Sequence, residues 1–80
     1  MAYPMYNQAE NIPTDANQTG KWKALWNNDT AGKYVKVDLC GGGSVGITFY
    51  MAAYSLLPCC VEKVYTSGTN VGNDKLTGLN

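Results

Sequence analysis

Clusters of glycine, asparagine and aspartate interrupt this sequence at short intervals after residue 20. They lie at residues 27–32, 41–44 and 67–70. Glycine and asparagine readily adopt the backbone conformations of tight turns, so these clusters mark the ends of extended segments. Turns spaced roughly eight to twelve residues apart are typical of small β-sandwiches and barrels. We therefore expect an all-β fold, a small sandwich or barrel of about four to six short strands.

The runs between these turns carry the two-residue period of a strand that buries one face. Residues 33–39 give the cleanest pattern, because Val35, Val37 and Leu39 alternate with charged residues. Residues 51–57 are apolar but irregular, and we expect a loop there. The expected strands cover residues 21–26, 33–39, 45–50, 59–66 and 75–79.

The N-terminal residues differ from the rest of the chain. Pro4 and Pro13 favour extended backbone, and no helical or strand period runs between them. The apolar groups of this segment are too scattered to offset the cost of ordering its backbone. We therefore expect an extended arm over residues 1–20 and a β domain over residues 21–80. Four side chains are large enough to anchor the arm on another chain: Tyr3, Met5, Tyr6 and Ile12.

Aromatic residues are the largest source of contact energy in so short a chain. Residues 21–26 alternate so that Trp22, Ala24 and Trp26 share one side of the expected strand. Such side chains fill a small core or lie at contacts between subunits, where tryptophan and tyrosine are enriched. On an exposed concave face they would instead stack on sugar rings. We expect Trp22 and Trp26 to serve core or partner contacts, with a carbohydrate-binding module as the alternative.

Charge and composition argue against several classes of function. The formal net charge is zero and all six basic residues are lysines, so the basic patch of a nucleic-acid-binding protein is missing. No histidine is present to activate a serine or cysteine nucleophile. Gly41, Gly43 and Gly46 match the spacing of a dinucleotide-binding loop, but a strand rather than a helix should follow them. We expect a hairpin loop there, no cofactor, and no enzymatic activity.

The cysteines predict neither a disulfide framework nor a metal site. There are three of them, Cys40, Cys59 and Cys60, and the two neighbours cannot easily pair with each other. We expect three free thiols, packed as small hydrophobes, in a protein made and folded in a reducing cytoplasm. The start of the chain does not resemble a signal peptide, and the longest apolar stretch is too short for a membrane-spanning helix.

A chain of 80 residues buries too little surface to be more than marginally stable. Without disulfides or a metal, partner chains are the remaining source of stability. We therefore expect a homo-oligomer, or a chain bound to a larger assembly, with no nucleic acid and no membrane as partner.

The C-terminal third combines a leucine-proline step, a valine-rich strand, a turn rich in threonine and glycine, and a short terminal strand. These features are carried by Leu56-Leu57-Pro58, Val61, Val64-Tyr65, residues 67–69, Leu76 and Gly78-Leu79. In this order they resemble the ending of small phage virion proteins. The named group that this pattern is most similar to is the head spike-base proteins of phage-like gene transfer agents.

This resemblance implies a structural protein of a phage or virus-like particle. The expected role is capsid decoration (cement) or a vertex subunit that binds the major capsid protein, with a tail or neck component as the alternative. The protein would be made in the host cytoplasm and reside in the virion. The residues expected to contact partners are Tyr3, Met5, Tyr6, Ile12, Trp22 and Trp26.

Overall fold

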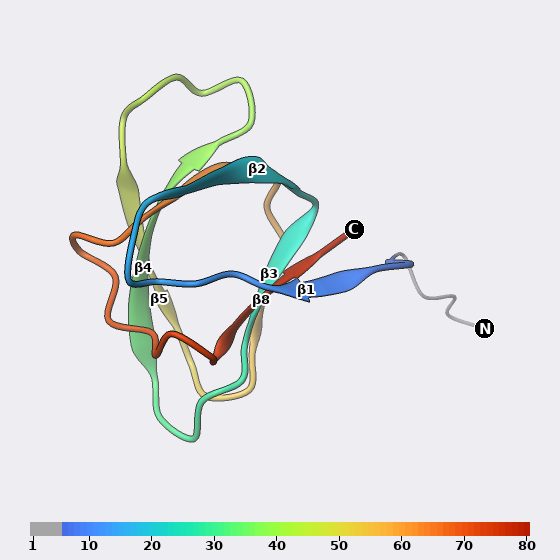
Figure 1. Ribbon diagram of the computed structural model, residues 1–80, viewed down its shortest axis with the longest axis vertical. Coiled ribbons are helices and arrows are strands. Elements are labelled where there is room, and N and C mark those ends of the chain that lie inside the picture. The colour runs from blue at the N-terminus through green and yellow to red at the C-terminus, as the bar shows by residue number, and fades with distance from the viewer. Residues whose placement is uncertain (1–5) are drawn as a thin grey trace.

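The computed structural model describes residues 6–80 and contains eight β-strands there (Figure 1). No helix occurs in this range, which confirms the all-β prediction. The strands are β1 (Ala9–Asn11), β2 (Gln18–Trp22), β3 (Ala24–Asn27), β4 (Lys33–Leu39), β5 (Ile47–Met51), β6 (Leu56–Leu57), β7 (Val61–Tyr65) and β8 (Leu76–Leu79). The count exceeds the expected range because β1 and β6 are very short strands in segments expected to be irregular.

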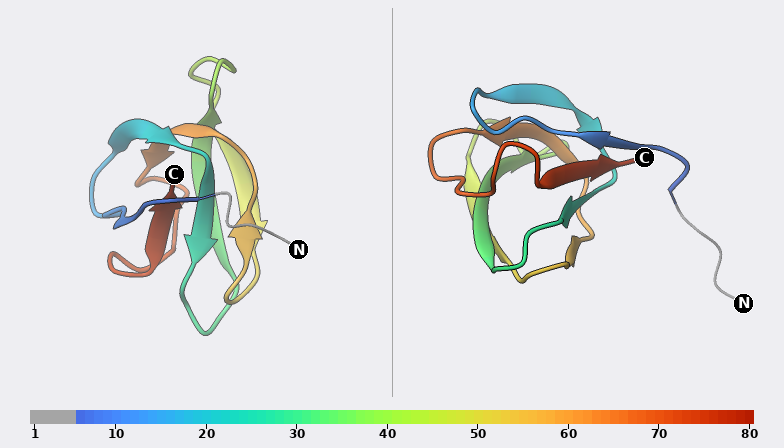
Figure 2. Two further views of the ribbon diagram at one scale, coloured as in Figure 1. Left: turned by 90° about the vertical axis from the view of Figure 1, so that its right-hand side faces the viewer. Right: turned by 60° about the horizontal axis from the view of Figure 1, so that its bottom comes forward.

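The strands form two four-stranded sheets, and every pairing is antiparallel. The first sheet has the order β1-β8-β3-β6, and the second has the order β2-β7-β4-β5. Figure 2 shows the two sheets curving around a shared interior, with the C-terminal strand β8 beside β1. No helix in residues 6–80 is long and apolar enough to cross a membrane.

Strand β4 follows the sequence pattern closely. Val35 and Val37 are fully buried, and Leu39 is partly buried against the same core. The chain then turns through the glycine-rich loop, where Gly41, Gly43 and Gly46 all have positive φ angles. This loop joins β4 to its antiparallel neighbour β5, as the prediction of a hairpin required. A side chain would be strained at these φ angles, which explains the glycines.

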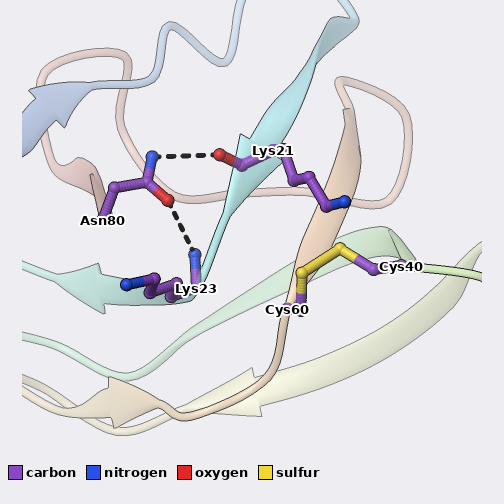
Figure 3. Close-up of a disulfide and its surroundings, with 5 residues drawn as sticks. All are labelled: Lys21, Lys23, Cys40, Cys60 and Asn80. Atoms are coloured by element: carbon purple, nitrogen blue, oxygen red, sulfur yellow. Dashed lines mark hydrogen bonds between the residues drawn. A yellow bond between two sulfur atoms is a disulfide. The ribbon is translucent and has the colours of Figure 1, made fainter. Parts of the chain in front are cut away.

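The expected strand over residues 21–26 is wrong, because the chain changes sheets in the middle of it. Strand β2 ends at Trp22 in the second sheet, and β3 begins at Ala24 in the first. At the corner, the Lys23 N–H donates to the carbonyl of Leu79 at 2.8 Å. The Asn80 amide also bridges this corner, and Figure 3 shows its two hydrogen bonds. After the corner, β3 shows no simple alternation: Ala24, Leu25 and Asn27 are buried, and Trp26 is partly buried.

The indole of Trp22 fixes how closely the two sheets approach each other. The side chain is only 5% exposed, and it lies directly on the backbone of Gly78 in β8. A Cβ atom at Gly78 would lie 2.3 Å from the Trp22 Cδ1 atom, so only glycine fits. The indole N–H donates to the Glu10 carboxylate at 2.6 Å, which satisfies its one polar group. The rest of the core consists of aliphatic residues and Met51.

The expected N-terminal arm needs correction. Strand β1 pairs with β8, and β2 begins at Gln18 opposite Val64 of β7. Ile12, between the two strands, is 1% exposed and belongs to the core cluster. Residues 9–20 are therefore part of the β domain. Their pairing partners, β7 and β8, lie near the C-terminus, so the local sequence could not indicate this pairing. Tyr3 and Met5 lie outside the described residues.

The prediction of three free thiols is also wrong. Cys40 and Cys60 form a disulfide, with Cα atoms 5.4 Å apart (Figure 3). Cys40 follows β4 and Cys60 precedes β7, and these strands are neighbours in the second sheet. The Cys40 N–H also donates to the Cys60 carbonyl at 3.0 Å, which aligns the two backbones for the bridge. Cys59 is the free cysteine and is partly buried.

Candidate interaction surface at the edge of strand β5

Strand β5 is an open edge of the second sheet, because β4 is its only strand neighbour in residues 6–80. Natural edge strands are usually protected by charge, irregularity or shortness. Strand β2 carries Lys21 and a register irregularity, β1 carries Glu10, and β6 has two residues. The five residues of β5 have a regular register and no charged side chain or proline. This edge therefore has the least protection against strand addition.

The backbone groups that face outward from β5 can be identified from its neighbour β4. Tyr34 uses its N–H and C=O to bond with Asn70, and the Lys36 N–H donates to Thr69; these partners lie on the side of β4 away from β5. In an antiparallel pair, alternate residues point their hydrogen-bonding groups toward the partner strand.

It follows that Val35 and its alternate neighbours bond to β5. The residues opposite Tyr34 and Lys36 are Tyr50 and Thr48. Their N–H and C=O groups therefore point away from β4, along the free edge of the sheet. These two residues present the open hydrogen-bonding positions of β5.

Most of the exposed apolar side chains lie in β5 or close to it in the sequence. The large hydrophobic residues exposed in residues 6–80 are Tyr34, Val45, Ile47, Tyr50, Tyr54 and Leu56. Five of these six lie between residues 45 and 56, in β5, in β6 or beside them. The sixth, Tyr34, lies opposite Tyr50, and the centroids of the two rings are 5.3 Å apart in an edge-to-face arrangement. Exposed apolar groups gathered in this way are typical of protein contact sites.

Two local features distinguish the tyrosines Tyr50 and Tyr54 of this surface. The Tyr50 ring lies against Gly32, where a Cβ atom would overlap the phenol oxygen. Tyr54 has a φ angle of 50°, the left-handed region that bulky residues avoid. Its side chain is 53% exposed, so burial in this chain does not explain the strain. Strained, exposed residues are often retained at binding sites.

A polar cluster lies on the outer face of the same sheet. The Tyr65 hydroxyl donates to both carboxylate oxygens of Asp38 at 2.9 Å, and the Gly46 N–H donates to the same carboxylate at 2.8 Å. The Nζ atoms of Lys36 and Lys63 lie 5.2 and 4.6 Å from the centroid of the Tyr65 ring. This arrangement keeps a nearly buried carboxylate hydrogen-bonded, and the lysines gain cation–π contacts.

The hydrogen bond to Asp38 raises the pKa of the Tyr65 phenol above its ordinary value of 10.0. Partial burial and the negative charge of Asp38 act in the same direction, because each disfavours the phenolate. The phenol is therefore a hydrogen-bond donor at neutral pH. A shallow depression of about 450 Å³ adjoins Asp38. No group of three potential metal-ligating side chains occurs in the described part of the chain.

Of the six residues predicted to contact partners, the four that the structure describes are all buried or partly buried in this chain. Ile12 and Trp22 are buried in the core of this chain, which leaves them no surface for a partner. Tyr6 and Trp26 are partly buried, and neither is close in sequence to β5. Tyr3 and Met5 fall outside residues 6–80.

Sequence reasoning missed the edge residues Thr48 and Tyr50. Their segment was expected to be a strand, but nothing local indicates which strand lies at the edge of a sheet. A signal was nevertheless present, because no charged residue occurs between Asp38 and Glu62. A stretch without charge can leave apolar groups exposed together, and such groups are typical of protein contact sites.

Comparison with known proteins provides no relative for this chain. No family model, curated protein or solved structure matches it.

Proposed function

We propose that this protein is a structural subunit of a phage or virus-like particle, a capsid decoration or vertex protein that works by binding other protein chains. The observation that carries the binding role is the unprotected edge of β5 with exposed apolar side chains around it. The assignment to a particle rests on the resemblance of residues 56–79 to small phage virion proteins.

The physical basis of this role is the burial of apolar surface between subunits. Removing apolar area from water contributes roughly 25 cal/mol per Å² before the costs of association. Such contacts, repeated by the symmetry of a shell, add up without any chemical step. A compact β domain in which the exposed side chains of Tyr34 and Tyr50 lie against each other suits such contacts.

The disulfide is compatible with a particle protein. Disulfides persist in oxidising surroundings, which include virion surfaces, and are rare in the cytoplasm. A subunit made in the cytoplasm would complete the Cys40–Cys60 bridge after the particle leaves the cell. The bridge then links β4 to β7 in the sheet that contains the β5 edge.

The carbohydrate-binding alternative receives less support. It required Trp22 or Trp26 to be exposed on a concave face. Trp22 is 5% exposed and Trp26 is partly buried. The exposed pair Tyr34 and Tyr50 packs edge to face, and this is not the flat platform on which a sugar ring stacks.

Co-sedimentation with particles tests the proposal. Nuclease-resistant particles are purified from the source culture by density gradient, and the amount of this chain is measured by quantitative mass spectrometry. We expect the chain in the particle fractions at a fixed ratio to the main shell protein. A chain that remains entirely in the soluble fraction, while intact particles band without it, would falsify the proposal.

A further inference from the structure

We propose that strand β5 pairs antiparallel with β5 of a second copy, around a two-fold axis that passes beside Phe49. The two four-stranded sheets that contain β5 would then join into one continuous sheet. This inference deepens the proposed binding role by naming one partner and one contact. It is independent of the particle, since two copies of the purified chain are sufficient to form the contact.

The backbone register favours a second copy because the open positions are self-complementary. Thr48 and Tyr50 point their backbone groups outward, and Phe49 lies between them. Two-fold pairing centred on Phe49 places Thr48 of each copy opposite Tyr50 of the other. Each residue has one N–H and one C=O, so the two residue pairs exchange two hydrogen bonds each. All the open groups of both residues are then satisfied.

This register places no like charges opposite one another between the two β5 strands. Ile47 comes opposite Met51 of the second copy, and Phe49 comes opposite its own counterpart at the closer, non-hydrogen-bonded spacing. Like charges directly opposite one another would be destabilising, but β5 has none. The formal net charge of zero also removes any long-range repulsion between two copies.

The same register brings exposed apolar groups from the two ends of the edge together. Val45 precedes β5 and is 68% exposed on the projecting loop between β4 and β5 (Figure 1). Because the strands run in opposite directions, Val45 of one copy approaches the segment that carries Tyr54 in the other. A partner of arbitrary sequence would not match both ends. These contacts favour a second copy of the chain as the partner of the β5 edge.

Sedimentation equilibrium of the purified, oxidised protein tests the pairing. We expect a reversible dimer, with a mass about twice the 8.6 kDa of the chain at the higher concentrations. Hydrogen exchange gives the residue-level readout: the Thr48 and Tyr50 amides should become protected as concentration rises. The Phe49 amide, bonded to β4, should be protected at every concentration.

A proline substitution separates the backbone contact from the side chain. Thr48→Pro removes an N–H that is not used within the monomer, and proline is tolerated at such edge positions. We expect its dimer dissociation constant to rise about tenfold or more. The matched control Thr48→Ala keeps the N–H and should dimerise like the natural sequence. The hydrogen-exchange readout needs no variant, so the test stands even if the proline variant does not fold.

Several results would overturn this inference. One is a monomer at all accessible concentrations, and another is a dimer whose Thr48 amide stays unprotected. If that amide is protected only in assembled particles, the partner of the β5 edge is a shell protein and not a second copy of this chain. In each case the proposed attachment to particles would remain open to its own co-sedimentation test.

Discussion

The Tyr65 hydroxyl shares its proton between the two carboxylate oxygens of Asp38, at 2.9 Å from each. The two residues lie on neighbouring strands, β7 and β4, so this contact links the centre of the second sheet on its outer face. Asp38 is 3% exposed, which is unusual for a carboxylate. The phenol and the Gly46 N–H replace the water that the carboxylate loses on burial.

The raised pKa of Tyr65 predicts a loss of stability at alkaline pH. The neutral phenol is favoured in the folded protein, so its contribution is fully present below pH 10.0, the ordinary pKa of tyrosine. That contribution is lost as the pH rises through the higher pKa of the folded state. We expect Asp38→Asn to lower the pKa of Tyr65, because the strongest acceptor and the nearby negative charge are both removed.

Carbon NMR of ring-labelled tyrosine measures this pKa directly, and Tyr65→Phe assigns the resonance among the six tyrosines. Asp74→Asn, at an exposed position, serves as the matched control and should leave the titration of Tyr65 unchanged. A Tyr65 titration that is the same with Asp38 and with Asn at position 38 would contradict the assignment of cause.

Removal of the disulfide should weaken the fold substantially. The bridge spans 20 residues, and closing a loop of this length stabilises a protein by roughly 3 kcal/mol. We expect Cys40→Ala to lower the free energy of unfolding by about this amount, as measured by urea denaturation. The control Cys59→Ala removes only a partly buried thiol and should cost about 1 kcal/mol or less.

A reducing agent provides a second check on the disulfide. Reduced protein of natural sequence should unfold at nearly the same urea concentration as the Cys40→Ala variant. If the reductant leaves the natural protein as stable as before, the bridge contributes little and the prediction fails.

The buried amide of Asn27 should be among the residues least tolerant of substitution. Its Nδ2 group donates to the carbonyls of Ala31, Met51 and Ala52, and its Oδ1 atom accepts from the Asp29 N–H. Asn27→Asp would aim a carboxylate oxygen at those carbonyls inside the protein. We expect a loss of about 3 kcal/mol or more in the free energy of unfolding.

The next residue provides the control for this substitution. Asn28 is exposed, so Asn28→Asp should change stability by about 0.5 kcal/mol or less. Thermal unfolding of the two variants side by side measures the difference. Equal midpoints would show that the hydrogen bonds of Asn27 contribute nothing beyond those of a surface amide.

The parts of the fold that depend only on neighbouring residues could be predicted from the sequence. The alternation of Val35 and Val37 predicted β4, and the glycines at positions 41 and 43 predicted the turn that follows. Both depend on neighbours within a few residues. The change of sheet at Lys23 was not predictable in this way, because the groups that hold the corner come from Leu79 and Asn80.

The candidate site was missed for a related reason. Whether Thr48 and Tyr50 are paired or open depends on the order of strands in the sheet, which is a property of the whole topology. The Cys40–Cys60 bridge has the same origin, since β4 and β7 become neighbours only in the folded chain. The odd number of cysteines and the adjacency of Cys59 and Cys60 predict free thiols, but neither feature prevents one of the adjacent pair from bonding to Cys40.

The last prediction concerns the N-terminal segment that was expected to be a separable arm. Ile12 is 1% exposed, and its N–H donates to the Leu76 carbonyl at 2.8 Å. Deletion of residues 1–19 would remove β1, Ile12 and the start of β2, and would open the core around Trp22. We therefore expect the truncated chain to be unfolded, with neither protected amides nor a cooperative thermal transition.

A point substitution tests the same conclusion without truncation. Ile12→Ala leaves a cavity in the core and should lower the free energy of unfolding by roughly 2 to 5 kcal/mol. Gln8→Ala changes an exposed side chain in the same segment and should have little effect. If Ile12→Ala and Gln8→Ala unfold at the same urea concentration, Ile12 does not pack in the core and residues 9–20 behave as an arm after all. A large difference would instead assign these residues to the cooperative unit, because only a side chain packed in the core transmits its loss to the whole fold.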